Sequence, residues 1–267
     1  MRDNKIRETK FFLISSKTQI HPNMMIPHKL SLLSLFSLTQ AQRIREKVNQ
    51  EYSLSVKEND NGETIVTGPG GMTRSINQIL GDDAFAAIDQ YGCWCYFEND
   101  HGRGKGAPVD SVDAMCKNLA MAYDCAMMDV AEETGVDDCV PWEVSYNAGL
   151  SFGIGALVPT CRDLNPGPDN LCAQYACMAE GAFVINVISA FLNIGTVNPM
   201  MQAKNGFDHS SSCQVNAGTQ TDERKCCGVL PYRFPYKPID KECCGASTYD
   251  PSMMDCCADN VPRFSCV

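Results

Sequence analysis

Two runs decide the fold of this chain: Tyr91-Gly92-Cys93-Trp94-Cys95, and Asp110-Ser111-Val112-Asp113-Ala114-Met115-Cys116. Asp110, Asp113 and Cys116 recur at every third residue, a spacing that brings side chains onto one side of an α-helix. Asp110 is a good N-cap, and Asp113 lies in the first turn, where a negative charge suits the helix dipole. Cys116 and Cys125 are nine residues apart and fall on opposite faces. We therefore predict a helix over residues 110–130 that disulfides tether on both sides.

The cysteine content predicts an extracellular protein. The chain has 267 residues, and all 16 cysteines follow Gly92. An even number at this density is typical of a secreted protein held by disulfides, whereas metal binding would need thiolates in a reducing compartment. We expect all of them to pair, and they are Cys93, Cys95, Cys116, Cys125, Cys139, Cys161, Cys172, Cys177, Cys213, Cys226, Cys227, Cys243, Cys244, Cys256, Cys257 and Cys266.

Residues 1–41 are predicted to contain a signal peptide. Lys29 precedes a short apolar run at residues 30–38, and Ala41 is a small residue suited to cleavage. A signal that starts at Met24 or Met25 is better formed than one that starts at Met1. A buried N-terminal helix is the alternative, which the shortness of the run disfavours. No run reaches the ~20 apolar residues that cross a bilayer.

The net charge of the chain restricts the classes of molecule that it can bind. Beyond residue 41 the chain carries 16 basic and 30 acidic residues, a net charge of −14. Such a surface is repelled by nucleic acid, and by anionic membranes unless a basic patch or bound cations intervene. We therefore expect no nucleic-acid partner. Calcium, a phospholipid or membrane surface, and an extracellular protein partner are compatible with this charge.

Three segments follow the signal region. Residues 42–74 are expected to form a polar linker or propeptide-like arm with a short strand at 63–67, residues 75–205 a helical domain, and residues 206–267 a small Cys-rich module. Periodic apolar side chains predict a second long helix over residues 170–193, while residues 148–159 suggest loops or short strands. Three Cys-Cys pairs predict a cystine-knotted module in which adjacent cysteines bond to different partners.

Residues 91–125, with similarity continuing to Cys177, resemble the secreted phospholipase A2 family. In that family a Tyr-Gly-Cys-x-Cys run leads into a glycine-rich calcium loop, and Pro-x-Asp-x-x-Asp opens a helix that carries cysteines and a His-Asp dyad. Residues 108–113 match this opening and Cys116 matches a helix cysteine, although Met115 stands where a second cysteine is usual. The resemblance implies a mainly α, disulfide-rich fold. It would contain a phospholipase A2-like pair of cross-linked antiparallel helices at 75–205, followed by the small Cys-rich unit.

The residues that the family uses for catalysis are absent from the matching positions. The histidine of the dyad activates a water, and its aspartate helps to hold the calcium that polarises the ester oxygen. The dyad positions fall on Leu119 and Ala120, or on Ala120 and Met121 if the register shifts by one residue. We expect these side chains to pack in the core, so that no catalytic residue is assigned.

The loop before the helix contains the candidate metal ligands. Glu98, Asn99 and Asp100 are hard oxygen donors that could bind calcium, and a solvated acidic turn is the alternative that we favour. We expect no other cofactor. His101 could act as a displaced base, although a lone histidine in a loop is usually inert.

Two further residues resemble parts of a hydrolase. Glu180 could correspond to the family's helix carboxylate that orients the histidine, but without that histidine we expect it to be solvated at the surface. His209 lies between Asp208 and Ser210, yet consecutive residues do not build a triad, so we expect a linker there.

The favoured interpretation is a secreted phospholipase A2-like pseudoenzyme that binds phospholipid, calcium or an extracellular protein. One alternative is an active calcium-dependent phospholipase A2 with a relocated base. A structural extracellular protein rich in disulfides is the other.

Overall fold

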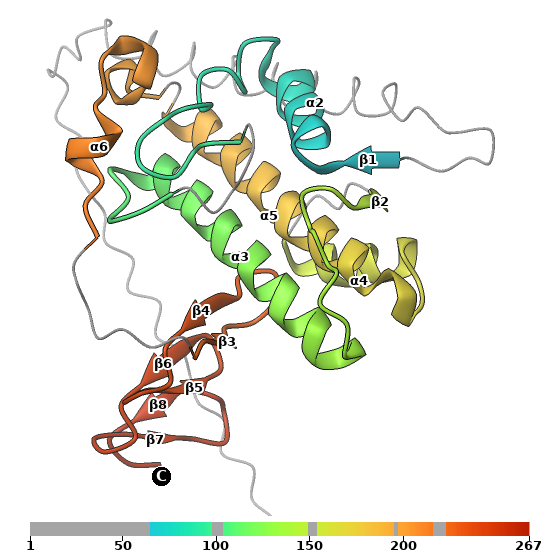
Figure 1. Ribbon diagram of the computed structural model, residues 1–267, viewed down its shortest axis with the longest axis vertical. Coiled ribbons are helices and arrows are strands. Elements are labelled where there is room, and N and C mark those ends of the chain that lie inside the picture. Colours follow the sequence, from blue (N-terminus) through green and yellow to red (C-terminus); the bar gives the residue numbers. More distant parts are fainter. Residues whose placement is uncertain (1–64, 98–103, 149–153, 195–196, 216–222, 267) are drawn as a thin grey trace, which may run out of the picture. The chain divides into compact units, whose positions relative to one another are not determined.

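The computed structural model describes residues 65–97, 104–148, 154–194, 197–215 and 223–266 (Figure 1). The predicted signal region, most of the arm at 42–74 and the loop with Glu98, Asn99, Asp100 and His101 lie outside these residues. Helices dominate the described part, and its strands form small antiparallel pairs.

Two long helices, α3 (Ser111–Thr134) and α5 (Leu171–Ile194), lie side by side and run antiparallel (Figure 1). Tyr175 near the start of α5 donates to Glu133 near the end of α3, which fixes their relative direction. The side chain of Asp110 accepts from the N–H groups of Val112 and Asp113, and Gly135 ends α3 with a φ of 74°. Both helices are where the sequence predicted them.

The core lies between these helices and α2 (Gly68–Leu80), which contacts α5. Ile76, Leu119, Phe183 and Val187 are all buried in it, and each such side chain contributes about 1.5–3 kcal/mol. Helix α2 begins before the predicted domain boundary at residue 75, and the run Gly68-Pro69-Gly70-Gly71 forms its first turn. Proline is tolerated there because the first N–H groups of a helix have no acceptor within the helix, so that its missing N–H removes no helical hydrogen bond.

The segment Pro168–Asn193 also has the length and apolar composition of a membrane span. However, 56% of its most apolar window is buried inside the protein, and the carboxylate of Glu180 lies within the segment. Burial on this scale is expected of the core helix of a folded domain.

Helix α4 (Ile154–Leu164) lies where the sequence suggested loops or short strands. It contains Pro159, which removes a backbone donor and disfavours a helix interior. Its contacts with α5 outweigh this preference. Cys161 bonds to Cys177, and Leu157 is buried so close to Gly181 that a Cβ there would lie 2.6 Å from its Cδ1.

Two short strands join the arm to the helices. Strand β1 (Ile65–Thr67) pairs antiparallel with β2 (Ser145–Asn147). The predicted strand at 63–67 is therefore confirmed for its last three residues.

From residue 225 on, the described part of the C-terminal module forms three antiparallel hairpins. They pair β3 (Lys225–Cys227) with β4 (Phe234–Tyr236), β5 (Glu242–Cys244) with β6 (Ser247–Tyr249), and β7 (Asp255–Cys256) with β8 (Pro262–Arg263). Each first strand contains or ends in a cysteine of a Cys-Cys pair, so the repeat in the sequence is also a repeat in structure.

All sixteen cysteines form eight disulfides, as the sequence predicted. This number is typical of an extracellular protein. Within the module the bonds are Cys227–Cys243, Cys244–Cys256 and Cys257–Cys266. Adjacent cysteines thus have different partners, as expected. The predicted cystine knot is wrong, because these loops follow one another and do not interleave.

The predicted cross-link between the two long helices is also wrong. In α3, Cys116 bonds to Cys95 and Cys125 to Cys226, while Cys172 and Cys177 of α5 bond to Cys139 and Cys161. The disulfides therefore fasten each helix to flanking segments. Ala122 and Ala179 line the same narrow crevices between the helices, where their small side chains permit close packing.

We expect the Cys125–Cys226 bond to stabilise the fold of the C-terminal module. Replacing both cysteines by alanine should lower the free energy of unfolding by about 3 kcal/mol, because the bond restricts the unfolded chain. Hydrogen exchange should then accelerate throughout β3–β8. In the matched pair Cys257→Ala and Cys266→Ala, which opens only the last loop, exchange should rise in β7 and β8 alone. Unchanged exchange at β3 and β4 in the first variant would contradict this prediction.

Candidate functional site

The loop at residues 91–97 is held onto the start of α3 by one buried carboxylate. Asp113 accepts from the backbone N–H groups of Cys93 at 2.9 Å, Trp94 at 2.7 Å and Val109 at 2.9 Å. Its side chain is fully buried, and this burial raises the pKa of its carboxyl, while the three hydrogen bonds act in the opposite direction. Gly92 is required beside it: its φ is 59°, and a Cβ would lie 2.5 Å from Asp113 Cγ.

The same loop is fixed at two further points. The hydroxyl of buried Tyr91 donates to the carboxylate of Asp110, and a disulfide joins Cys95 to Cys116. Asp110 thus caps the helix and binds the loop with different oxygens. The two sequence runs that suggested the fold are therefore joined in space.

Glu180 is the clearest correction to the sequence analysis. Predicted to be solvated, it is only 1% exposed. One of its carboxylate oxygens accepts from the hydroxyl of Tyr123 on α3 at 2.7 Å, and the other accepts from Tyr146 on β2 at 2.6 Å. The carboxylate therefore connects three elements inside the protein.

We call Glu180, Tyr123 and Tyr146 the Glu180 cluster. Burial has the largest effect on the pKa values of these three side chains. It raises the pKa of Glu180 to about 7, although both tyrosine hydrogen bonds act to lower it. Burial also raises the pKa of each tyrosine well above its usual value. A carboxyl group that titrates near neutrality is often functional. Here, both oxygens are engaged and the group is enclosed, which suits a structural hub better than a base exposed to substrate.

The residues at the predicted dyad positions carry no proton acceptor. Leu119 is 2% exposed and Ala120 is 7% exposed, while Met121 is half-buried. Leu119 lies one helical turn before Tyr123, in a core cluster that also contains Phe183. The face of α3 next to the Glu180 cluster is thus lined by a hydrocarbon side chain.

The predicted calcium ligands Glu98, Asn99 and Asp100, and the candidate base His101, lie outside the described residues. Their roles remain predictions. Within the residues that are described, no three His, Cys, Asp or Glu side chains are grouped so that they could hold a metal ion.

His209 lies against the loop at residues 91–97 and not in a linker. It begins the short helix α6 (His209–Ser212), and its Nε2 is 3.2 Å from the carbonyl oxygen of Cys93. Its ring contacts Tyr96 with centroids 4.8 Å apart. Asp208 accepts from the N–H groups of Ser210 and Ser211 and so caps α6. The Cys93–Cys213 disulfide brings the segment there, a pairing that the sequence alone did not reveal.

The chain matches no protein-family model, no curated protein sequence and no solved structure. Two arrangements bear on its function: the loop supported by Asp113 and the Glu180 cluster.

Proposed function

We propose that this is a secreted phospholipase A2-like protein that does not hydrolyse phospholipids and keeps its scaffold to bind phospholipid, calcium or an extracellular partner. One observation carries the proposal: Leu119 and Ala120 are buried on α3, in the positions where the resemblance would place the histidine and aspartate. The surrounding frame supports it. The Tyr-Gly-Cys-x-Cys loop is anchored at the start of this helix, and a carboxylate faces the helix from α5.

Hydrolysis of an ester requires a group that removes a proton from water and a positive charge that stabilises the developing oxyanion. The side chains of Leu119 and Ala120 have no lone pairs and can neither accept a proton nor bind a cation. Glu180 could orient a histidine in an active relative, but in this chain its two oxygens accept from Tyr123 and Tyr146 instead. The loop and the two long helices therefore fit a protein that binds a ligand without hydrolysing it.

We expect hydrolysis of mixed phospholipid micelles by the oxidised mature protein to stay at background at millimolar calcium. A His101→Gln variant should behave like the wild type, as should His209→Gln, the matched control at a second histidine. Calcium-dependent turnover that His101→Gln abolishes and His209→Gln preserves would overturn the proposal in favour of an active phospholipase with a relocated base.

Binding separates the proposal from a purely structural role. Calcium titration followed by co-sedimentation with phosphatidylcholine liposomes measures it directly on the same oxidised protein. A melting temperature that neither calcium nor liposomes change, together with no co-sedimentation, would favour a structural extracellular protein.

A further inference from the structure

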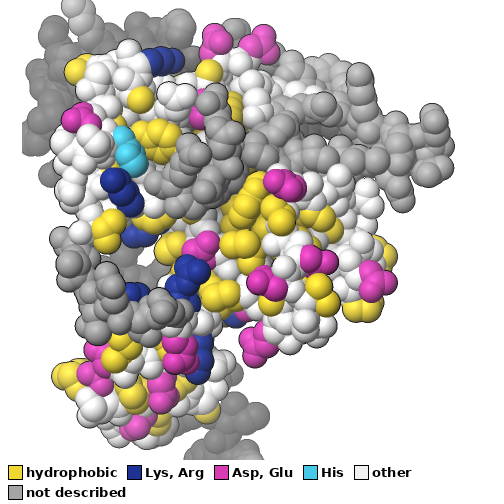
Figure 2. Space-filling view, in the orientation of Figure 1, with side chains coloured by type: hydrophobic (Ala, Val, Ile, Leu, Met, Phe, Trp, Pro, Cys, Tyr) yellow, Lys and Arg dark blue, Asp and Glu magenta, His cyan; other side chains and the backbone are white. Residues whose placement is uncertain are grey.

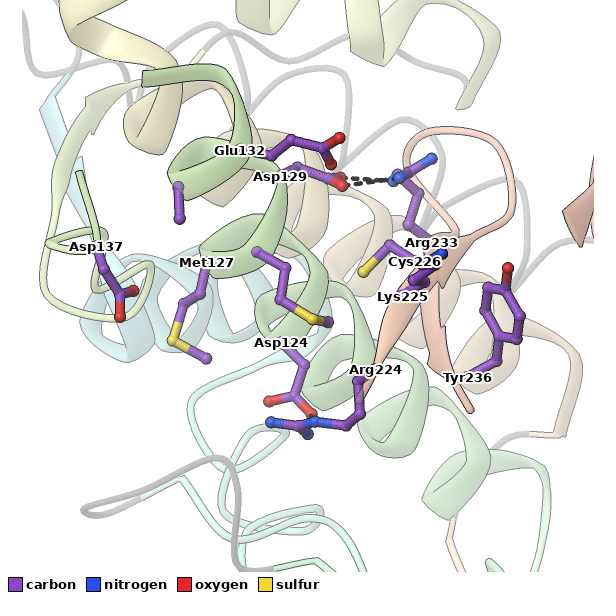
Figure 3. Close-up of a pocket in the computed structure, with 12 residues that line it drawn as sticks. Asp124, Met127, Asp129, Glu132, Asp137, Arg224, Lys225, Cys226, Arg233 and Tyr236 are labelled. Carbon is purple, nitrogen blue, oxygen red and sulfur yellow. Dashed lines mark hydrogen bonds and ion pairs between the residues drawn. The ribbon is translucent and has the colours of Figure 1, made fainter. Parts of the chain in front are cut away.

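A hollow of 720 Å³ lies between α3 and the first hairpin of the module (Figure 3). On the helix side it is lined by Met127, Met128 and Glu132, and on the hairpin side by Arg224 and Lys225. The Cys125–Cys226 bond fastens the two sides together, so the hollow is a built feature of the fold. We call it the α3–β3 groove.

Two ion pairs join α3 to the hairpin side across the α3–β3 groove. Arg233 donates from Nε and Nη2 to the two oxygens of Asp129, at 2.6 and 2.8 Å, and Figure 3 shows these side chains facing each other. Nη1 of Arg224 lies 3.4 Å from Asp124 Oδ2. These contacts neutralise two of the acidic side chains and hold the hairpin against the helix.

The remaining acidic side chains have no such partner. Glu132 and Asp137 are exposed, and within the described residues neither forms an ion pair or a hydrogen bond. Glu132 also lies in the last turn of α3, which contains no basic residue. Carbonyl groups make this end of a helix negative, and cations are favoured there. A positively charged occupant would thus relieve unfavourable electrostatics at this end of the groove.

The groove is long enough for a short segment of chain. Asp124 and Glu132 are two helical turns apart, a span of about 12 Å, which is close to the length of four extended residues. Met127 and Met128 lie between them, and flexible thioethers adapt to varied apolar groups. Figure 2 shows a hydrophobic patch with Asp and Glu side chains around it on the visible face of the helical part.

We propose that the α3–β3 groove docks a short basic segment of an extracellular partner protein. Lysine or arginine side chains of the segment lie at Glu132 and Asp137, and an apolar side chain of the same segment covers Met127 and Met128. The proposal goes beyond the loss of hydrolysis, because the groove uses none of the residues of the Glu180 cluster or of the loop at 91–97. It holds whether or not the protein proves to be an enzyme.

The test uses the full oxidised chain and a fluorescent acetylated hexapeptide with a lysine at each end and leucines between. Anisotropy titration should show saturable binding with one site, weakened by salt because exposed charges are screened. We expect the Glu132→Gln, Asp137→Asn double variant to bind at least tenfold more weakly. The matched double variant Asp82→Asn, Asp83→Asn removes the same charge from an exposed turn and should bind within twofold of the wild type.

A second pair of variants tests the role of Met127 and Met128, which line the groove. Met127→Lys places a competing cation inside the groove and should abolish binding, whereas Asn118→Lys on an exposed position of the same helix should not. Urea unfolding verifies that each variant is folded. Equal weakening by both acidic double variants, or equal affinity for a peptide with norleucine in place of lysine, would overturn the proposal. It would also fail if the Glu132 and Asp137 variant altered only calcium binding, vesicle binding or self-association.

Discussion

Replacing Glu180 by alanine is expected to lower the free energy of unfolding by about 3–5 kcal/mol. The change leaves the hydroxyls of Tyr123 and Tyr146 without their acceptor in the interior and opens a cavity between α3, α5 and β2. Buried groups without a hydrogen-bond partner cost about 1–3 kcal/mol each, and the lost packing adds to this. Urea unfolding at pH 5, where the Glu180 carboxyl is mostly protonated, measures the difference.

The conservative variant Glu180→Gln separates the hydrogen bonds from the size of the side chain. Glutamine keeps the volume and one acceptor oxygen, so we expect a smaller loss of about 1–2 kcal/mol at the same pH. Glu132→Ala, an exposed glutamate on α3, should change stability by less than about 0.5 kcal/mol. If Glu180→Ala were as mild as Glu132→Ala, the Glu180 cluster would have no structural role.

Glu180 also predicts a dependence of stability on pH. Its pKa in the folded protein is about 7, above its ordinary value of 4.5, because burial disfavours the charged form. The folded state therefore holds a proton that the unfolded state releases. The stabilisation is complete below about pH 4.5 and is lost as the pH rises through 7, by about 3 kcal/mol in total. The difference between wild type and Glu180→Gln in urea midpoints from pH 4.5 to 8 isolates this contribution from that of other carboxyls.

The parts of the fold that the sequence predicted are those with local signals. Asp110 marks the start of α3 because a cap acts within three residues. The predicted end at residue 130 is four residues short of Thr134, after which Gly135 ends the helix with its left-handed conformation. Regular apolar spacing likewise identified α5. Helix α4 had no such signal, because Pro159 argues against a helix and only its contacts with α5 reveal why one forms.

The candidate site was harder to predict, because it is formed by contacts between residues that are far apart in the sequence. Glu180 is 57 residues from Tyr123 and 34 residues from Tyr146, so its burial could not be read from neighbouring residues. Glu180 was predicted to be solvated because the histidine that it would orient is absent, and neither tyrosine partner could be recognised from the sequence. The disulfide partners were unpredictable for the same reason: Cys93 and Cys213 are 120 residues apart, and the position of His209 follows from that bond. In contrast, the proposed absence of a dyad needs no long-range contact, because it rests on the resemblance and on which residues occupy positions 119–121.

Asp113→Ala is expected to lower the free energy of unfolding by about 3–5 kcal/mol and to release the loop at residues 91–97. Three backbone N–H groups, those of Cys93, Trp94 and Val109, lose their acceptor, and hydrogen bonds to a charged group are stronger than neutral ones. Asp113→Asn should be nearly as damaging, because one of its oxygens is replaced by a donor that faces other donors. The Cys95–Cys116 bond keeps the loop near α3 in both variants, so the fold should survive while the loop loosens.

Hydrogen exchange at Cys93 and Trp94 measures this release, and we expect it to accelerate far more there than in α5. Asp124→Ala is a suitable control, because it lies on the same helix and its ion pair with Arg224 is partly exposed, so the loss should be at most about 1 kcal/mol. Equal exchange at Trp94 in the Asp113→Ala and Asp124→Ala variants would mean that the disulfides alone hold the loop. In that case the buried carboxylate at the start of α3 would not be what joins the two sequence runs from which the fold was predicted.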